Sequence, residues 1–294
     1  MKKFFVLFFT ILMTLFVFAA CAPKGDTIIV GAKNYTEQLI LGNILEILVA
    51  ENTDLKTRLV SNLASDIIFK AIQSGDVHLY AEYTGTIYGN YFGFTERKTS
   101  DEIFQITRDG MLERHNILVL DKLGYNNTYT LSVRQDTAAQ HNLRTFSDLA
   151  KVSPQLTLGA TLEFLNREDG FLGVQRVYGM NFRNSIAIDG SLRYTAIMND
   201  EIQVTDAFST DGMLLRFNLV SLEDNLDFFP AYYAVPIIRQ DIAQKYPQLL
   251  DVLGKLSGVL DEEGMQRLNF RVDVEQIDPQ TVARDFLKSA GLIP

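Results

Sequence analysis

The sequence predicts an α/β fold of two lobes, joined by two crossings of the chain, with a ligand cleft between them. First, apolar β-branched segments alternate with segments of helical period, which is typical of βαβ units. Second, removing a leader of 20 residues leaves 274 of 294 (294 − 20), more than one comfortable core. Third, Thr128–Val133 and Phe229–Ala231 look like places where the chain passes between lobes. Ligands of open α/β folds bind in such crevices.

The N-terminus reads as an export signal. A basic start precedes an apolar run, Phe4–Phe18, that is short for a membrane span. The following Ala-Ala-Cys resembles a bacterial lipobox, in which the cysteine becomes the lipidated mature N-terminus. We therefore expect residues 1–20 to be a signal peptide and 21–26 a tether anchored through Cys21, the only cysteine of the chain. The alternative is a plain signal peptide with a chance cysteine.

The first third of the body alternates strand and helix. Thr27–Gly31 is apolar and β-branched, as expected of a buried strand. Thr36 is the expected N-cap of a helix to Ala50 with apolar residues at helical spacing. A strand over Leu55–Val60, a helix over Ser65–Ser74 and a strand over Val77–Tyr80 follow. This alternation predicts a parallel sheet with helices on both faces.

The rest of the chain continues in the same style. Its expected strands are Thr128–Val133, Leu156–Ala160, Ile186–Asp189 and Val204–Phe208. Its expected helices are Ser191–Met198, Pro247–Val259 and Pro279–Ser289. With the crossings placed as above, lobe I comprises 27–129 plus 232–294 and lobe II comprises 130–231.

Composition and motifs argue against several functions. The net charge of −9 becomes about −11 once Lys2 and Lys3 leave with the signal, which argues against nucleic acid as a partner. The three histidines are widely spaced, and no zinc-binding pair, nucleophile elbow or phosphate loop is present. We therefore expect no enzyme activity, no metal and no cofactor. Carboxylates are plentiful, so an extracytoplasmic enzyme on the same fold is kept as an alternative.

Four aromatic residues stand at strand ends or crossings. They are Tyr83, Tyr129, Phe208 and Tyr232. Core packing explains any one of these rings, but it explains less well that all four occupy such positions. Rings around one cleft hold a quaternary ammonium by cation–π attraction, worth about 0.5–2 kcal/mol per ring.

Five motifs occur in this order along the chain: GAKNYTEQ (31–38), AEYTGT (81–86), NNTYTL (126–131), DAFSTDG (206–212) and FFPAYYAVP (228–236). Together they resemble the substrate-binding proteins of osmoprotectant ABC importers, the glycine betaine/carnitine/choline (ProX/OpuC) type. The resemblance implies a two-lobed periplasmic-binding-protein-like (type II) fold and a cation cage made of the four rings above. The sequence departs at Phe208, where the family usually has tyrosine, so one hydroxyl is lost and the identity of the ligand is less defined.

The resemblance also implies how the carboxylate end of a betaine is held. Lys33, Thr86 and Arg167 match the family's positions, and charged donors suit a carboxylate. The alternatives are a solvated surface lysine at Lys33 and local pairing of Arg167 with Glu168 or Asp169. Glu37 and Gln38 are interpreted as helix-start residues, though one of them could face the cleft.

The resemblance implies a lipoprotein on the outer face of the membrane that delivers a quaternary-ammonium solute to an ABC permease subunit. We expect a monomer. Ergothioneine, which also carries trimethylammonium and carboxylate groups, is the alternative ligand.

Overall fold

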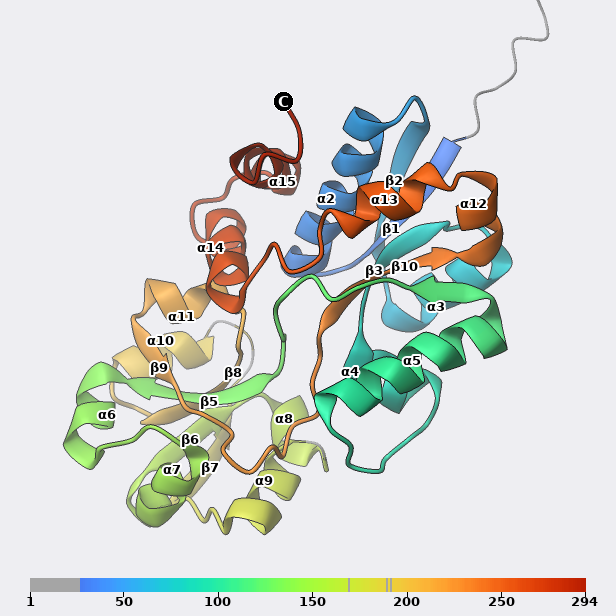
Figure 1. The fold of residues 1–294 in the computed structure, drawn as a ribbon. Coiled ribbons are helices and arrows are strands. Elements are labelled where there is room, and N and C mark those ends of the chain that lie inside the picture. Colours follow the sequence, from blue (N-terminus) through green and yellow to red (C-terminus); the bar gives the residue numbers. More distant parts are fainter. Residues whose placement is uncertain (1–26, 169, 189, 191) are drawn as a thin grey trace, which may run out of the picture.

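The computed structural model describes residues 27–168, 170–188, 190 and 192–294, which form two lobes (Figure 1). Each lobe is built on a sheet of five strands within this part of the chain. The predicted signal peptide, the tether and Cys21 lie outside the described residues.

Lobe I is built on the sheet β2-β1-β3-β10-β4. Its strands are β1 (Thr27–Lys33), β2 (Lys56–Leu63), β3 (Leu79–Tyr83), β4 (Ile117–Val119) and β10 (Ala234–Arg239). Side chains alternate between its faces, because Leu79 and Tyr83 join one apolar cluster and Tyr80 joins another. The helices are α2 (Thr36–Asn52), α3 (Ser65–Ser74), α4 (Thr84–Thr86), the π-helix η1 (Ile87–Tyr91), α5 (Ser100–His115), α12 (Gln240–Lys245), α13 (Gln248–Gly254), α14 (Glu262–Asp273) and α15 (Pro279–Ser289).

Lobe II is built on the sheet β7-β6-β8-β5-β9. Its strands are β5 (Tyr129–Arg134), β6 (Thr157–Ala160), β7 (Asn184–Ala187), β8 (Val204–Phe208) and β9 (Leu219–Ser221). Its helices are α6 (Gln135–His141), α7 (Phe146–Val152), the 3-10 helix η2 (Ser153–Gln155), α8 (Leu162–Asn166), α9 (Phe171–Tyr178), α10 (Leu192–Met198) and α11 (Gly212–Arg216).

The sheets are mixed, so the prediction of a parallel sheet is wrong in part. The pairs β1–β2 and β1–β3 are parallel, whereas β10 runs antiparallel to both β3 and β4. A proline is rare inside a sheet because it cannot donate to the ladder. Pro236 is tolerated in β10 because the pairing of that strand with β4 begins only at Ile237.

The start of α2 also differs from the prediction. Tyr35 is the N-cap residue and Thr36 is the first residue of the helix. The Thr36 hydroxyl does not cap the helix; it donates to Asp273 Oδ1 at 2.6 Å. This bond joins α2 to the end of α14, which lies beside it (Figure 1).

The chain passes between the two sheets through 120–128 and again through 222–233. The lobes also touch where α11 packs on α14 (Figure 1). Gly212 makes this approach possible, because a Cβ there would lie 2.5 Å from the backbone nitrogen of Phe270. Among the described residues, no helix is long and apolar enough to span a bilayer.

Candidate functional site

Two of the predicted rings lie at the turn after β3 on lobe I. Tyr83 is the last residue of β3 and is 4% exposed. Thr84 ties the turn to the second crossing, since its hydroxyl donates to Ala231 O at 2.9 Å and accepts from Tyr233 N at 3.1 Å. The Tyr232 ring lies over Gly85, where a Cβ would come within 2.7 Å of it. Glycine is therefore required for this packing.

The other two rings form a pair on lobe II. Tyr129 and Phe208 lie opposite each other in the antiparallel pair β5–β8. Their ring centroids are 4.6 Å apart in a stacked arrangement, and Tyr129 also packs against Phe164 at 5.2 Å. Phe208 is nevertheless 42% exposed. An aromatic face held in place yet open to solvent is what a cation–π site needs.

Lys33 lies at the end of β1 and is buried, 2% exposed, rather than a solvated surface lysine. Its Nζ is 2.5 Å from Glu82 Oε1 and 5.5 Å from the centroid of the Tyr83 ring. A ligand carboxylate that reaches Lys33 would therefore meet an ammonium whose charge is already balanced.

Glu82 accepts three further hydrogen bonds besides the one from Lys33. The hydroxyls of Tyr91 and Tyr80 donate to its Oε2 at 2.5 and 3.1 Å, and Tyr83 N donates to Oε1 at 2.9 Å. Burial, followed by the charge of Glu82, raises the pKa of Tyr91 well above its usual value. The phenol therefore stays a donor to Glu82 at neutral pH.

The remaining predicted polar residues lie on different lobes. Thr86 ends α4 on lobe I and is half-buried. Arg167 follows α8 on lobe II, and its Nη1 is 2.8 Å from Glu163 Oε1. Glu168, one of the two partners in the alternative of local pairing, bonds Arg176 at 2.9 Å. Asp169 lies outside the described residues.

Tyr35 and Gln38, at the start of α2, do more than begin the helix. Gln38 is 1% exposed; its Nε2 donates to Ala81 O at 2.9 Å, and its Oε1 has no partner among the described residues. Tyr35 keeps 40% of its surface exposed, while burial of its hydroxyl, followed by the charge of Glu37, raises its pKa. Tyr35, Glu37 and Gln38 follow closely on the end of β1, and an aromatic with two polar residues at such a place could have indicated site residues. They were instead interpreted as residues that begin a helix.

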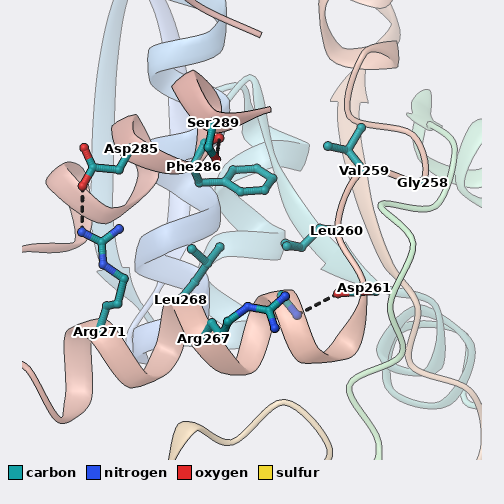
Figure 2. Close-up of a pocket in the computed structure, with 11 residues that line it drawn as sticks. Gly258, Val259, Leu260, Asp261, Arg267, Leu268, Arg271, Asp285, Phe286 and Ser289 are labelled. Atoms are coloured by element: carbon teal, nitrogen blue, oxygen red, sulfur yellow. Dashed lines mark hydrogen bonds and ion pairs between the residues drawn. The ribbon is translucent and has the colours of Figure 1, made fainter. Parts of the chain in front are cut away.

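A surface pocket of about 550 Å³ lies elsewhere, between α14, α15 and residues 258–261 of lobe I (Figure 2). Its two arginines are paired: Arg267 with Glu263 at 2.5 Å and Arg271 with Asp285 at 2.7 Å. The pocket contains none of the predicted site residues. Its lining offers a single aromatic ring, Phe286, which is not a cage for a cation.

The chain matches known proteins along almost its whole length. Residues 26–289 match the OpuAC family, described as the substrate binding domain of the ABC-type glycine betaine transport system. The carnitine transport binding protein OpuCC of Listeria monocytogenes is 36% identical, with 98% of this chain and 96% of that protein covered. The ergothioneine transport permease/ergothioneine binding protein EgtU of Helicobacter pylori is 34% identical over 97% of this chain and 52% of that protein.

Solved structures with a similar fold belong to the same class of transport proteins. A crystal structure of a glycine betaine/carnitine/choline ABC transporter superposes with a TM-score of 0.87 and 30% identity, covering 90% of this chain and 99% of that one. A lactococcal OpuAC in its closed-liganded conformation with glycine betaine shares the fold at 13% identity and a TM-score of 0.60, covering 90% of this chain and 96% of that one. The predicted two-lobed periplasmic-binding-protein-like (type II) fold is confirmed.

Proposed function

The chain belongs to the OpuAC family and is the extracytoplasmic substrate-binding protein of an ABC importer for quaternary-ammonium compatible solutes, and we propose that it grips the solute's cation between its two pairs of rings. It is a transport binding protein and not an enzyme. The stacked pair of Tyr129 and Phe208 carries this proposal. Phe208 offers an exposed aromatic face, 42% of its surface, and the stacked Tyr129 ring holds that face in place, as a cation–π site needs.

Tyr83 and Tyr232, which lie at the turn after β3, complete the cage from lobe I. A trimethylammonium group keeps its charge at every pH and donates no conventional hydrogen bond, so aromatic faces suit it better than one tight carboxylate. In this proposal the lobes close over the ligand by a hinge motion. Lys33, Thr86 and Arg167 then face the carboxylate of a betaine.

Glycine betaine, carnitine and choline are the first ligands to test. Ergothioneine is the second candidate, supported by the 34% identity to a Helicobacter pylori protein named for that solute. Phe208 lacks the hydroxyl usual in the family, so the cage does not decide between ergothioneine and the other three solutes.

We expect isothermal calorimetry of the purified protein to give a dissociation constant well below 1 mM for at least one of these four solutes. Glycine, which has the carboxylate without the quaternary nitrogen, is the control and should not bind measurably. If all four solutes bind no tighter than about 1 mM, roughly −4 kcal/mol, the proposed function is wrong.

We also propose that Cys21 carries a lipid anchor that holds the protein at the outer face of the membrane, close to its permease. Cys21→Ala in the full-length chain removes the residue that would carry the lipid, so we expect this variant to take up no fatty-acid label and to leave the membrane fraction. Fractionation of cells and labelling with a fatty-acid probe measure this. An unlabelled wild-type protein would show a plain signal peptide instead.

A further inference from the structure

Glu37 is a buried carboxylate at the junction of the two lobes. It lies in the first turn of α2 and is 4% exposed. Among the described residues, five side-chain donors reach it: to Oε1, Tyr83 OH at 2.6 Å, Tyr125 OH at 2.8 Å and Asn127 Nδ2 at 3.0 Å; to Oε2, Thr210 Oγ1 at 2.6 Å and Asn269 Nδ2 at 3.2 Å. A carboxylate has about four lone-pair sites, so these donors saturate it.

These donors come from segments far apart in the sequence. Tyr83 ends β3 of lobe I, Tyr125 and Asn127 belong to the first crossing, and Asn269 belongs to α14. Thr210 lies just after β8 of lobe II, two residues beyond Phe208. One carboxylate therefore bonds a ring of lobe I and the segment that carries a ring of lobe II.

The charge of Glu37 is balanced by dipoles. Within residues 27–294 as described, no ion pair includes it. The five donors, and the N-terminal turn of α2 in which Glu37 stands, present positive dipole ends to the carboxylate. Glutamine could not replace it without turning an N–H group toward at least two of the donors.

The surrounding bonds indicate that this is where the lobes stay joined. Ser209 donates from its hydroxyl to Asn126 O at 2.7 Å, and Gln266 Nε2 donates to Ser209 O at 2.6 Å. Gly212 packs directly on the backbone of α14. The 209–212 segment is thus fixed to the first crossing and to lobe I.

We propose that Glu37 is a positioning residue for ligand binding. It orients the Tyr83 ring through the phenol hydroxyl and, through Thr210, fixes the angle at which lobe II presents Phe208. The ligand-binding part of this proposal rests on the proposed function; the connection between the lobes does not.

A double-mutant cycle on affinity tests the link to Tyr83. Wild type, Glu37→Gln, Tyr83→Phe and the double variant are titrated with the tightest of the four solutes. We expect Glu37→Gln to weaken binding at least about tenfold, as for loss of charged hydrogen bonds. In the double variant the two losses should not multiply fully, because both change the same bond: Glu37→Gln replaces its carboxylate acceptor by an amide, and Tyr83→Phe removes its donor. Wild-type affinity in Glu37→Gln, or losses that multiply fully, would overturn the link.

Glu46→Gln is the matched control. Glu46 lies on the same helix and accepts a hydrogen bond from Thr57, all within lobe I. We expect it to change thermal stability at most and to leave affinity unchanged. Equal losses of affinity in both variants would mean that Glu37 acts only by general destabilisation.

Distances between spin labels test the connection between the lobes without any ligand. Labels at Lys70→Cys and Lys151→Cys, both exposed and one on each lobe, are placed in a Cys21→Ser background. We expect Thr210→Val and Glu37→Gln to broaden the distance distribution, whereas Glu46→Gln should not. If both variants keep the distance distribution of wild type, the proposed connection is wrong. This outcome does not depend on whether any solute binds. If Glu37→Gln does not fold, the distance distribution of Thr210→Val alone tests the connection between the lobes.

Discussion

Lys33→Met is expected to lower the free energy of unfolding by about 3–5 kcal/mol, the cost of leaving one partner of a buried ion pair uncompensated. Glu82 is fully buried, and without Lys33 its charge would depend on the tyrosine hydroxyls and one backbone N–H. Urea denaturation of the unliganded protein, followed by circular dichroism, measures the difference. A loss below about 1 kcal/mol, as at surface pairs, would mean that this ion pair is open in solution.

The double variant Lys33→Met/Glu82→Gln separates stability from ligand binding. Removing both charges should restore most of the stability, because the desolvation cost of each ion disappears with it. If Lys33 also faces the ligand carboxylate, the restored protein should bind glycine betaine more weakly while its affinity for choline is unchanged. Equal affinities of the double variant and wild type for both solutes would leave Lys33 with a structural role only.

Local pattern was enough to place the rings at strand ends. Tyr129 and Phe208 could be singled out because each adjoins a β-branched or apolar run, and neighbouring strands bring such ends together. The direction of β10 was not predictable in this way. A period of two is the same in parallel and antiparallel strands, and Ala234–Arg239, which contains Pro236, was not among the expected strands.

The charged partners could not be read from the sequence at all. Lys33 and Glu82 are 49 residues apart, and Glu37 and Thr210 are 173 residues apart. Whether a lysine at a strand end faces water or a buried carboxylate depends on which strand lies beside it. For the same reason Glu37, in the first turn of a helix, looked like an ordinary contribution to the helix dipole.

Tyr232→Ala is expected to weaken the affinity for a quaternary-ammonium solute by about 1–3 kcal/mol, or roughly 5–150-fold, through loss of one wall of the cage. The ring covers Gly85 in the turn that follows Tyr83, so its removal opens this side of lobe I. Tyr232→Phe keeps the aromatic face and should retain most of the affinity. Calorimetry measures both variants, and thermal unfolding without ligand confirms that each is folded.

The neutral tert-butyl isostere of choline distinguishes cation–π attraction from simple apolar contact. It has nearly the shape of the trimethylammonium group but no charge, so it gains only the burial of its methyl groups. We expect it to bind wild type far more weakly than choline and to lose little further affinity in Tyr232→Ala. If the isostere and choline lose affinity equally in that variant, the ring contributes packing alone; if neither loses any, Tyr232 does not belong to the cage.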